Sequence, residues 1–434
     1  MTHDHCTRYT RWLAPSLVLS ALALSACQRN SPENKPAEAP KPAGVQAGSY
    51  RAVLQTPGGE LPFGLTLAQE NGRWVAYLVN GPEHLPVDEV SVTGTHLEIL
   101  MPGYENRLIA DAAGDTLKGE IVLSKADAKQ QHVPLQAQLG QNYRFYAPEA
   151  APGAPAPADV SGHWAATFLD DDGSREADVG EFTQKGDSVT GTILTPTGDH
   201  RYLEGQVHGE ELDLSTFDGA HVFLYKAKID TDGTLSGDFW SGLASHEKWS
   251  AKRDPNAKLA DAYTYTKMKK GTKRFDFSFP DLSGTTVTSK DPKFKGKVII
   301  VALAGSWCPN CHDEAAFLSQ LYRDDHGRGL EIVSLMFEHF GDFPRAAAAA
   351  ERFKDHYGIG YTMLIAGISN KDEAGKKLPM LDKFYAFPTT VFIDKKGLVR
   401  KIHTGFTGPA TGEHYSQFVK EVNDTLDELL AEKG

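Results

Sequence analysis

The chain has 434 residues, enough for about three domains of ordinary size. Its 40% hydrophobic and 24% charged residues are typical of a globular protein, and no apolar run reaches the roughly 20 residues of a membrane-spanning helix. The formal charge of −12 argues against a nucleic-acid partner, because phosphate binding depends on clustered Lys and Arg.

The first 26 residues have the pattern of an export signal. Arg8 and Arg11 give a positively charged start, and residues 13–26 form a short apolar stretch that ends in small residues. This ending, followed by Cys27, resembles the lipobox of bacterial lipoproteins, in which cleavage leaves the cysteine as the lipid-bearing first residue. We therefore expect residues 1–26 to be removed and Cys27 to anchor the protein to a membrane. An ordinary signal peptide is the alternative.

Two stretches rich in Pro and Ala, residues 27–47 and 147–159, favour extended chain without a core. We expect the first to be a tether and the second to be a linker between domains. The segments they delimit, residues 48–146 and 160–253, contain short runs of alternating apolar and polar residues, broken about every eight to twelve positions by Gly, Asp or Asn. This spacing predicts two all-β modules, each a small barrel or sandwich.

The two segments also resemble two copies of one module. Tyr50 corresponds to Trp164, 114 positions later, and Gly119 corresponds to Gly237, 118 positions later. We expect the two aromatic residues to be core strand residues. The histidines of both segments are scattered at irregular spacings and supply no catalytic group, so the modules are expected to act as spacers or docking surfaces.

Beyond the second module the pattern changes to strands that alternate with helices, which predicts an α/β domain over residues 265–434. A polar stretch at residues 367–381 is expected to be an insertion ahead of Pro388. The predicted order β-α-β-α-β-β-α consists of a strand at 298–304, a helix at 308–323, a strand at 330–337, a helix at 343–357, strands at 388–394 and 398–403, and a helix at 416–431.

Cys308 and Cys311 lie where a predicted buried strand passes into a helix. The free N–H groups and the dipole of a helix N-terminus stabilise a thiolate, so we expect a lowered pKa for Cys308 and assign it as the attacking sulfur. Cys311 follows one turn later and can resolve a mixed disulfide. The pair predicts thiol-disulfide exchange with no cofactor beyond its own disulfide. A zinc site, which requires more ligands, a structural disulfide and buried free thiols are the alternatives.

Residues 275–434 resemble the thioredoxin superfamily, in the TlpA-like branch of membrane-attached thiol-disulfide oxidoreductases. The resemblance rests on residues 275–282, on the strand that enters the Cys-x-x-Cys pair and on the later Phe-Pro-Thr that begins a strand. It implies a cis-proline that faces the cysteines and leaves a backbone edge free for an extended substrate peptide. The residues that border the substrate are then Trp307, Phe387, Pro388 and Thr389.

Glu314 lies one turn after Cys311 and matches a glutamate of the TlpA-like pattern. A carboxylate there can exchange a proton with Cys311, although an acidic residue favoured by the helix dipole is an equal alternative. His312 is expected to face solvent, with tuning of the thiolate as the alternative. The chain has Ala315 and Ala316 where the family usually has a proline, which leaves the curvature of the helix open.

These features together predict an exported cell-envelope lipoprotein that faces the periplasm and exchanges disulfides with protein thiols. It would require an upstream membrane or periplasmic redox partner, whereas no metal and no nucleic acid is expected. Three alternatives remain: a thiol peroxidase, a copper metallochaperone of thioredoxin fold, and a binding lipoprotein that uses the β-modules. The dipeptide between the cysteines does not indicate the direction of electron flow.

Overall fold

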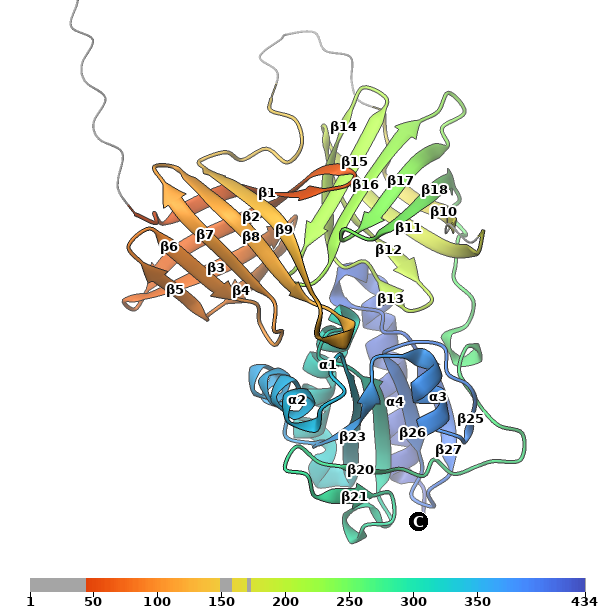
Figure 1. Ribbon diagram of the computed structural model, residues 1–434. Helices are drawn as coiled ribbons and strands as arrows, with labels where there is room; N and C mark the ends of the chain where they lie inside the picture. Colours follow the sequence, from red (N-terminus) through yellow and green to blue (C-terminus); the bar gives the residue numbers. More distant parts are fainter. Residues whose placement is uncertain (1–43, 149–157, 170–172, 434) are drawn as a thin grey trace, which may run out of the picture. The chain divides into compact units, whose positions relative to one another are not determined.

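The computed structural model describes residues 44–148, 158–169 and 173–433 (Figure 1). The predicted leader, Cys27 and most of the tether and of the Pro/Ala linker lie outside the described residues. Among the helices described in these ranges, none combines the length and the apolar character that crossing a membrane requires.

The first module is a nine-stranded antiparallel sheet in the order β4-β3-β2-β1-β9-β8-β7-β6-β5 (Figure 1). Alternate residues of its strands point inward and form an apolar core, which also includes Phe217, Val222 and Leu224 of the second module. The strands are β1 (Gly48–Thr56), β2 (Gly59–Glu70), β3 (Arg73–Asn80), β4 (Glu83–Val87), β5 (Val90–Thr93), β6 (His96–Leu100), β7 (Arg107–Ala113), β8 (Thr116–Ser124) and β9 (Gln130–Leu139).

The second module is a nine-stranded antiparallel sheet in which β11 also pairs with β12. This pairing closes all strands except β13 into a ring, so the module is a barrel with few free edges. The strands are β10 (Gly162–Leu169), β11 (Arg175–Lys185), β12 (Ser188–Thr195), β13 (Gly198–Asp199), β14 (Leu203–His208), β15 (Glu211–Phe217), β16 (Val222–Ile229), β17 (Leu235–Ser241) and β18 (Ser245–Arg253).

The two modules share the details that the sequence repeat predicts. Tyr50 and Trp164 each lie near the start of the first strand, are 2% and 1% exposed, and donate a hydrogen bond to the backbone carbonyl four residues earlier, at 2.8 and 2.9 Å. Gly119 and Gly237 lie at matching places in β8 and β17, where a Cβ would stand 1.9 Å from a carbonyl oxygen of the adjacent strand. Only glycine permits this close approach.

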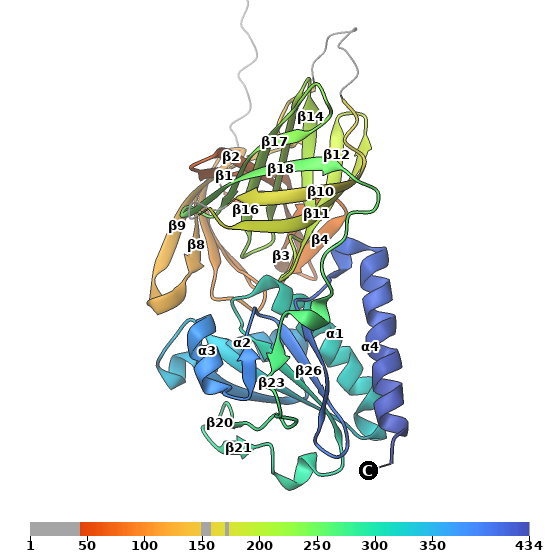
Figure 2. The ribbon, with the colours of Figure 1, turned by 90° about the vertical axis from the view of Figure 1, so that its right-hand side faces the viewer.

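The C-terminal domain contains a five-stranded sheet in the order β24-β23-β22-β26-β27, with β22, β23 and β24 parallel and the last two antiparallel. α1 packs against both α2 and α4, through contacts such as His312–Phe353 and Phe317–Phe418, and in Figure 2 α1 and α4 lie on the same side of this sheet. The main elements are β22 (Val298–Ala304), α1 (Pro309–Asp325), β23 (Leu330–Glu338), α2 (Phe343–Tyr357), β24 (Thr362–Ile368), α3 (Lys371–Lys377), β26 (Thr389–Ile393), β27 (Val399–Thr404) and α4 (Glu413–Ala431).

The domain also has four short strands at its periphery. They are β19 (Lys267–Met268) paired with β25 (Leu381–Lys383), and β20 (Ser278–Pro280) paired with β21 (Thr286–Thr288). The predicted fold class, two all-β modules followed by an α/β domain, is confirmed. Each predicted helix and strand of the last domain is present within a few residues of its expected bounds.

Besides these four short strands, the predicted order omits one strand of the main sheet and one helix of this domain. The edge strand β24 was missed, although its residues are apolar and mostly buried. The stretch expected to be a polar insertion contains α3, because the side chain of Asn370 caps a helix by accepting hydrogen bonds from the backbone N–H groups of Asp372 and Glu373.

Candidate active site

The cysteine pair lies at the junction of β22 and α1, where the sheet delivers the chain to the helix N-terminus. Cys308 is the N-cap residue of α1, and its Sγ accepts a hydrogen bond from the backbone N–H of Cys311 at 3.3 Å. The two residues form a disulfide, with 5.2 Å between their Cα atoms. Pro309 occupies the first turn, where a missing N–H has no cost. The sulfur of Cys308 therefore stands where helix N–H groups stabilise negative charge.

The Phe387–Pro388 peptide bond is cis, and Phe387 brings this segment beside the cysteine motif. Its ring meets the ring of Trp307 edge to face, with 5.8 Å between centroids. Thr389 follows at the start of β26, fully buried, and its hydroxyl donates to the carbonyl of Ala386 at 2.7 Å. Trp307 and Phe387 thus contact each other next to Pro388. The Thr389 side chain, in contrast, is buried and hydrogen-bonded to the backbone of its own turn.

Glu314 lies on α1 and is 2% exposed. The hydroxyl of Thr390 donates a hydrogen bond to its carboxyl group. Burial raises the pKa of Glu314 to about 7, and the hydrogen bond from Thr390 only partly opposes this shift. A carboxyl with this pKa can both accept and release a proton near neutral pH, three residues from Cys311.

The expectation that His312 faces solvent is wrong. Its side chain is 1% exposed, and its ring stacks on Tyr104 of the first module with 3.8 Å between centroids. Burial lowers the pKa of His312 to about 3, so the ring is neutral. Nε2 then donates to the carbonyl of Ser306 at 2.7 Å, and Nδ1 accepts from the Tyr357 hydroxyl at 2.9 Å.

The residues just before the cysteines are also held by a buried carboxyl group. Glu338, at the end of β23, accepts hydrogen bonds from the backbone N–H and the hydroxyl of Ser306 at 3.1 and 2.6 Å. Burial raises the pKa of Glu338 to about 7. The indole N–H of Trp307 donates to the carbonyl of Phe337 at 2.7 Å, and its ring stacks on His339 at 4.9 Å. Hydrogen bonds and ring stacking therefore fix Ser306 and Trp307, the two residues before Cys308.

An ionic cluster connects α1 to both β-modules. Arg201 of the second module forms ion pairs with Glu83 of the first module at 2.8 Å, with Asp218 at 3.3 Å and with Asp313 of α1 at 3.4 Å. Arg201 is 7% exposed, and burial raises the pKa of Asp313 to about 7 despite the nearby guanidinium. Removal of one partner from such a cluster leaves buried charge uncompensated.

Asn310, within the cysteine motif, contacts the backbone of the second module. In the amide orientation that satisfies both of its polar atoms, the nitrogen donates to the carbonyl of Asp199 at 3.1 Å and the oxygen accepts from the Asp199 N–H at 2.9 Å. A Cβ on the preceding Gly198 would lie 1.5 Å from a terminal atom of the Asn310 amide group. The carboxylate of Asp199 accepts from the N–H of Gly408 at 2.6 Å. The motif is therefore in direct contact with β13.

Sequence reasoning missed the residues that reach the motif from elsewhere in the chain. Tyr104 and Arg201 lie about a hundred or more positions before it, and no local pattern links them to the cysteines. Glu338 could have been found from the sequence, because a charged residue at the end of a predicted buried strand requires a hydrogen-bonding or ionic partner. Among the residues that the structure describes, no group of three or more His, Cys, Asp or Glu side chains has a metal-binding arrangement.

A sheet with the order of this domain, a Cys-x-x-Cys pair at the first helix and a cis-proline beside it together define a thioredoxin-like domain. Residues 270–402 match the AhpC/TSA family. The chain is 24% identical over 152 residues to the thiol-disulfide oxidoreductase ResA of Halalkalibacterium halodurans, which is 35% of this chain and 77% of that protein. It is 27% identical over 156 residues to ResA of Bacillus anthracis, 36% of this chain and 80% of that protein.

The solved structures similar to this chain include a thiol:disulfide interchange protein of the thioredoxin family from Chlorobium tepidum. It is 19% identical, with a TM-score of 0.28, over 37% of this chain and 97% of that one. Residues 270–402 thus have the fold and the family match of a TlpA-like domain of the thioredoxin superfamily, and the relatives that this part of the chain matches are named thiol-disulfide oxidoreductases.

Proposed function

We propose that this protein exchanges disulfides with exported proteins through Cys308 and Cys311. The observation that carries the proposal is the position of the Cys308 sulfur at the N-cap of α1, where it accepts the Cys311 N–H. The same interaction stabilises a Cys308 thiolate when the pair is reduced.

In the reducing direction, the Cys308 thiolate attacks a substrate disulfide. One bond forms between Sγ of Cys308 and a substrate sulfur, and the other substrate sulfur leaves as a thiolate that takes up a proton. Cys311 then loses its proton and attacks Sγ of Cys308, which releases the second substrate thiol. Two electrons pass to the substrate, and the protein retains the Cys308–Cys311 disulfide. The reverse sequence oxidises a substrate dithiol.

Glu314 is proposed to take the proton that Cys311 loses. Its pKa of about 7, caused by burial, matches a proton acceptor that works near neutral pH. Trp307, Phe387 and Pro388 are proposed to border the substrate, with Thr389 supporting the cis-proline turn through its bond to Ala386.

The proposal includes export and a lipid on Cys27, supported by the leader-like pattern of residues 1–26. Residues 27–47 would separate the domains from the bilayer, and an upstream redox partner in the membrane or periplasm would reset the cysteine pair. Labelling of cells with radioactive palmitate tests the anchor: wild type should be labelled and Cys27→Ala should not. An equally labelled Cys27→Ala variant contradicts the lipid anchor.

The exchange reaction is tested with the full chain in an insulin-reduction assay. Cys308→Ser should abolish activity, because no attacking thiolate remains. Cys311→Ser should accumulate mixed disulfides that gel electrophoresis without reductant detects, because the resolving thiol is absent. Full activity in either variant contradicts the proposal. Peroxide consumption by the reduced protein would instead favour a thiol peroxidase, and tight copper retention a metallochaperone.

A further inference from the structure

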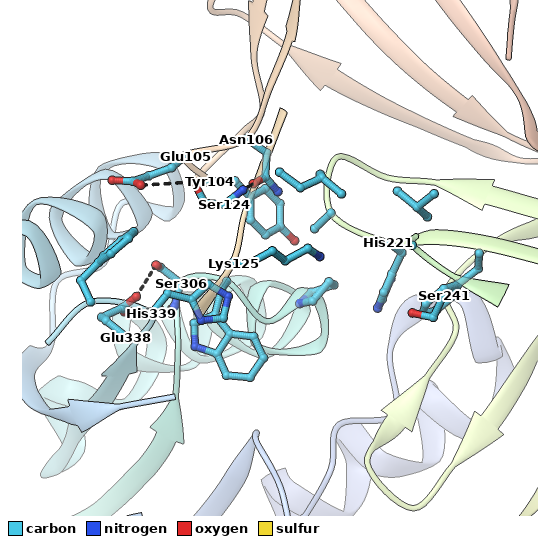
Figure 3. A pocket seen from close by; sticks show the side chains of 18 residues that line it. Tyr104, Glu105, Asn106, Ser124, Lys125, His221, Ser241, Ser306, Glu338 and His339 are labelled. Atoms are coloured by element: carbon cyan, nitrogen blue, oxygen red, sulfur yellow. Dashed lines mark hydrogen bonds between the residues drawn. The ribbon is translucent and has the colours of Figure 1, made fainter. Parts of the chain in front are cut away.

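A cavity of about 340 Å³ opens beside the cysteine motif (Figure 3). Trp307 and Pro309, which flank Cys308, contribute to its wall together with residues of both β-modules. Its volume is near the lower limit of small-molecule sites, which begin at about 300 Å³. The cavity therefore fits a small disulfide compound or one or two side chains of a peptide.

Four aromatic side chains contribute to the wall of the cavity. Tyr104, Phe223, Trp307 and Phe340 line it, and they come from both modules and from the C-terminal domain. Aromatic walls bury the apolar part of a ligand and orient it, while a few polar groups determine its specificity.

The acidic side chains of the wall are already engaged. Glu105 forms an ion pair with Arg345 at 3.3 Å. Glu338 accepts a hydrogen bond from the hydroxyl of Ser306 at 2.6 Å, and burial raises the pKa of Glu338 to about 7. Neither carboxyl group is available to neutralise a cation in the cavity.

Lys125, just after β8, is the cationic group that remains. Its side chain keeps contact with solvent, and in Figure 3 Lys125 and His221 reach into the cavity from different sides. Partial burial lowers the pKa of Lys125, and within the described part of the chain no carboxylate forms an ion pair with its ammonium group. His221, in contrast, is paired with Asp218 at 2.9 Å.

We propose that this cavity binds a carboxylate-bearing part of the disulfide substrate, with the carboxylate on the ammonium group of Lys125 and the apolar part against the Trp307 wall. The inference rests on the proposed thiol-disulfide exchange. It assigns a selective role to the first β-module, since Lys125 lies outside the thioredoxin-like domain. The carboxylate can belong to a free disulfide compound or to an acidic side chain beside a substrate cysteine.

The experiment compares the reactions of two aromatic disulfides with the reduced full chain. One is dithiobis(nitrobenzoate), which carries two carboxylates, and the other is the neutral dithiodipyridine. The quantity measured is the second-order rate constant for dithiobis(nitrobenzoate) divided by that for dithiodipyridine, each from a single oxidation of the reduced protein. Lys125→Gln should lower this ratio about fivefold, the range of a solvent-accessible ion pair. High salt should lower the wild-type ratio in the same direction, because ions screen the pair.

Lys129→Gln is the matched control, because Lys129 is an exposed lysine nearby that pairs with Asp127 at 3.6 Å and does not line the cavity. It should leave the ratio unchanged. An unchanged ratio in Lys125→Gln, or an equal change in both variants, overturns the inference. If the wild-type protein does not reduce insulin, the proposed function itself is refuted.

A pair of disulfide peptides with Glu or Gln beside the cysteine distinguishes the two sources of the carboxylate. If Lys125→Gln removes a preference for the Glu peptide, the cavity accepts acidic side chains of proteins. If it changes the ratio only for the two small compounds, the cavity accepts a free disulfide. Both results support carboxylate recognition, whereas no preference in either pair of substrates refutes it.

Discussion

The buried carboxyl group of Glu314 leads to a quantitative prediction about pH. Its pKa is raised from 4.5 to about 7 by burial. A raised pKa means that the folded state binds the proton more tightly than the unfolded state. The stability linked to Glu314 is therefore fully present below pH 4.5 and is lost as the pH rises through 7.

Glu314→Gln should remove this dependence, because the amide stays neutral. Relative to wild type, the oxidised variant should gain about 1.4 kcal/mol of stability per pH unit between pH 4.5 and 7, and about 3 kcal/mol in total by pH 8. A constant offset from the altered hydrogen bond with Thr390 is added at every pH. The slope with pH, and not the offset, tests the reasoning.

Hydrogen exchange of peptides from β22, measured by mass spectrometry on the full chain, gives the stability of this domain. Glu428→Gln on α4 is the control, because it makes the same substitution at an exposed carboxylate, which pairs with Arg400 at 3.5 Å. A pH-independent difference between Glu314→Gln and wild type would show that Glu314 ionises normally, and its proposed role as proton acceptor for Cys311 would lose its basis.

Two further substitutions test the contacts around the motif. Gly198→Ala should separate β13 from the motif and destabilise the protein by about 1 to 3 kcal/mol in urea unfolding, because the new Cβ meets the Asn310 amide. Gly186→Ala also adds a Cβ at positive φ but meets no atom within 4 Å, so an equal loss there would refute the contact argument. His312→Phe should cost about 1 to 3 kcal/mol at pH 7, because the Ser306 carbonyl loses its donor. Because the pKa of His312 is lowered, its contribution to wild-type stability is fully present above about pH 6.5 and is lost as the pH is lowered. The stability difference between His312→Phe and wild type should therefore be about 2 kcal/mol smaller at pH 5 than at pH 7. A difference that does not change with pH would show that the pKa of His312 is not lowered.

Local sequence patterns predicted the elements of the C-terminal domain well. The bounds of β22 and α2 agree residue for residue with the expected strand at 298–304 and helix at 343–357. An unbroken apolar run and a helical periodicity each depend on neighbours within one element, so the sequence alone contains them. β24 was missed because an apolar run interrupted by Gly367 gives a weaker signal.

The repeat of the β-modules was likewise visible in sequence, because glycines such as Gly119 and Gly237 are required wherever the same two strands approach closely. Closure of the second barrel was not visible. It depends on the pairing of β11 with β12 around a ring, and strand patterns do not specify which strands complete a ring.

The sequence by itself determined the reactive pair: two cysteines at the start of a helix, after a buried strand, which are placed for thiol-disulfide exchange. Only the tertiary structure decided what surrounds them. His312 is buried because Tyr104, more than two hundred residues away, stacks on it, and Asn310 pairs with the backbone of Asp199. Such contacts join segments with no shared periodicity, so their partners emerge only when the packed domains bring them together.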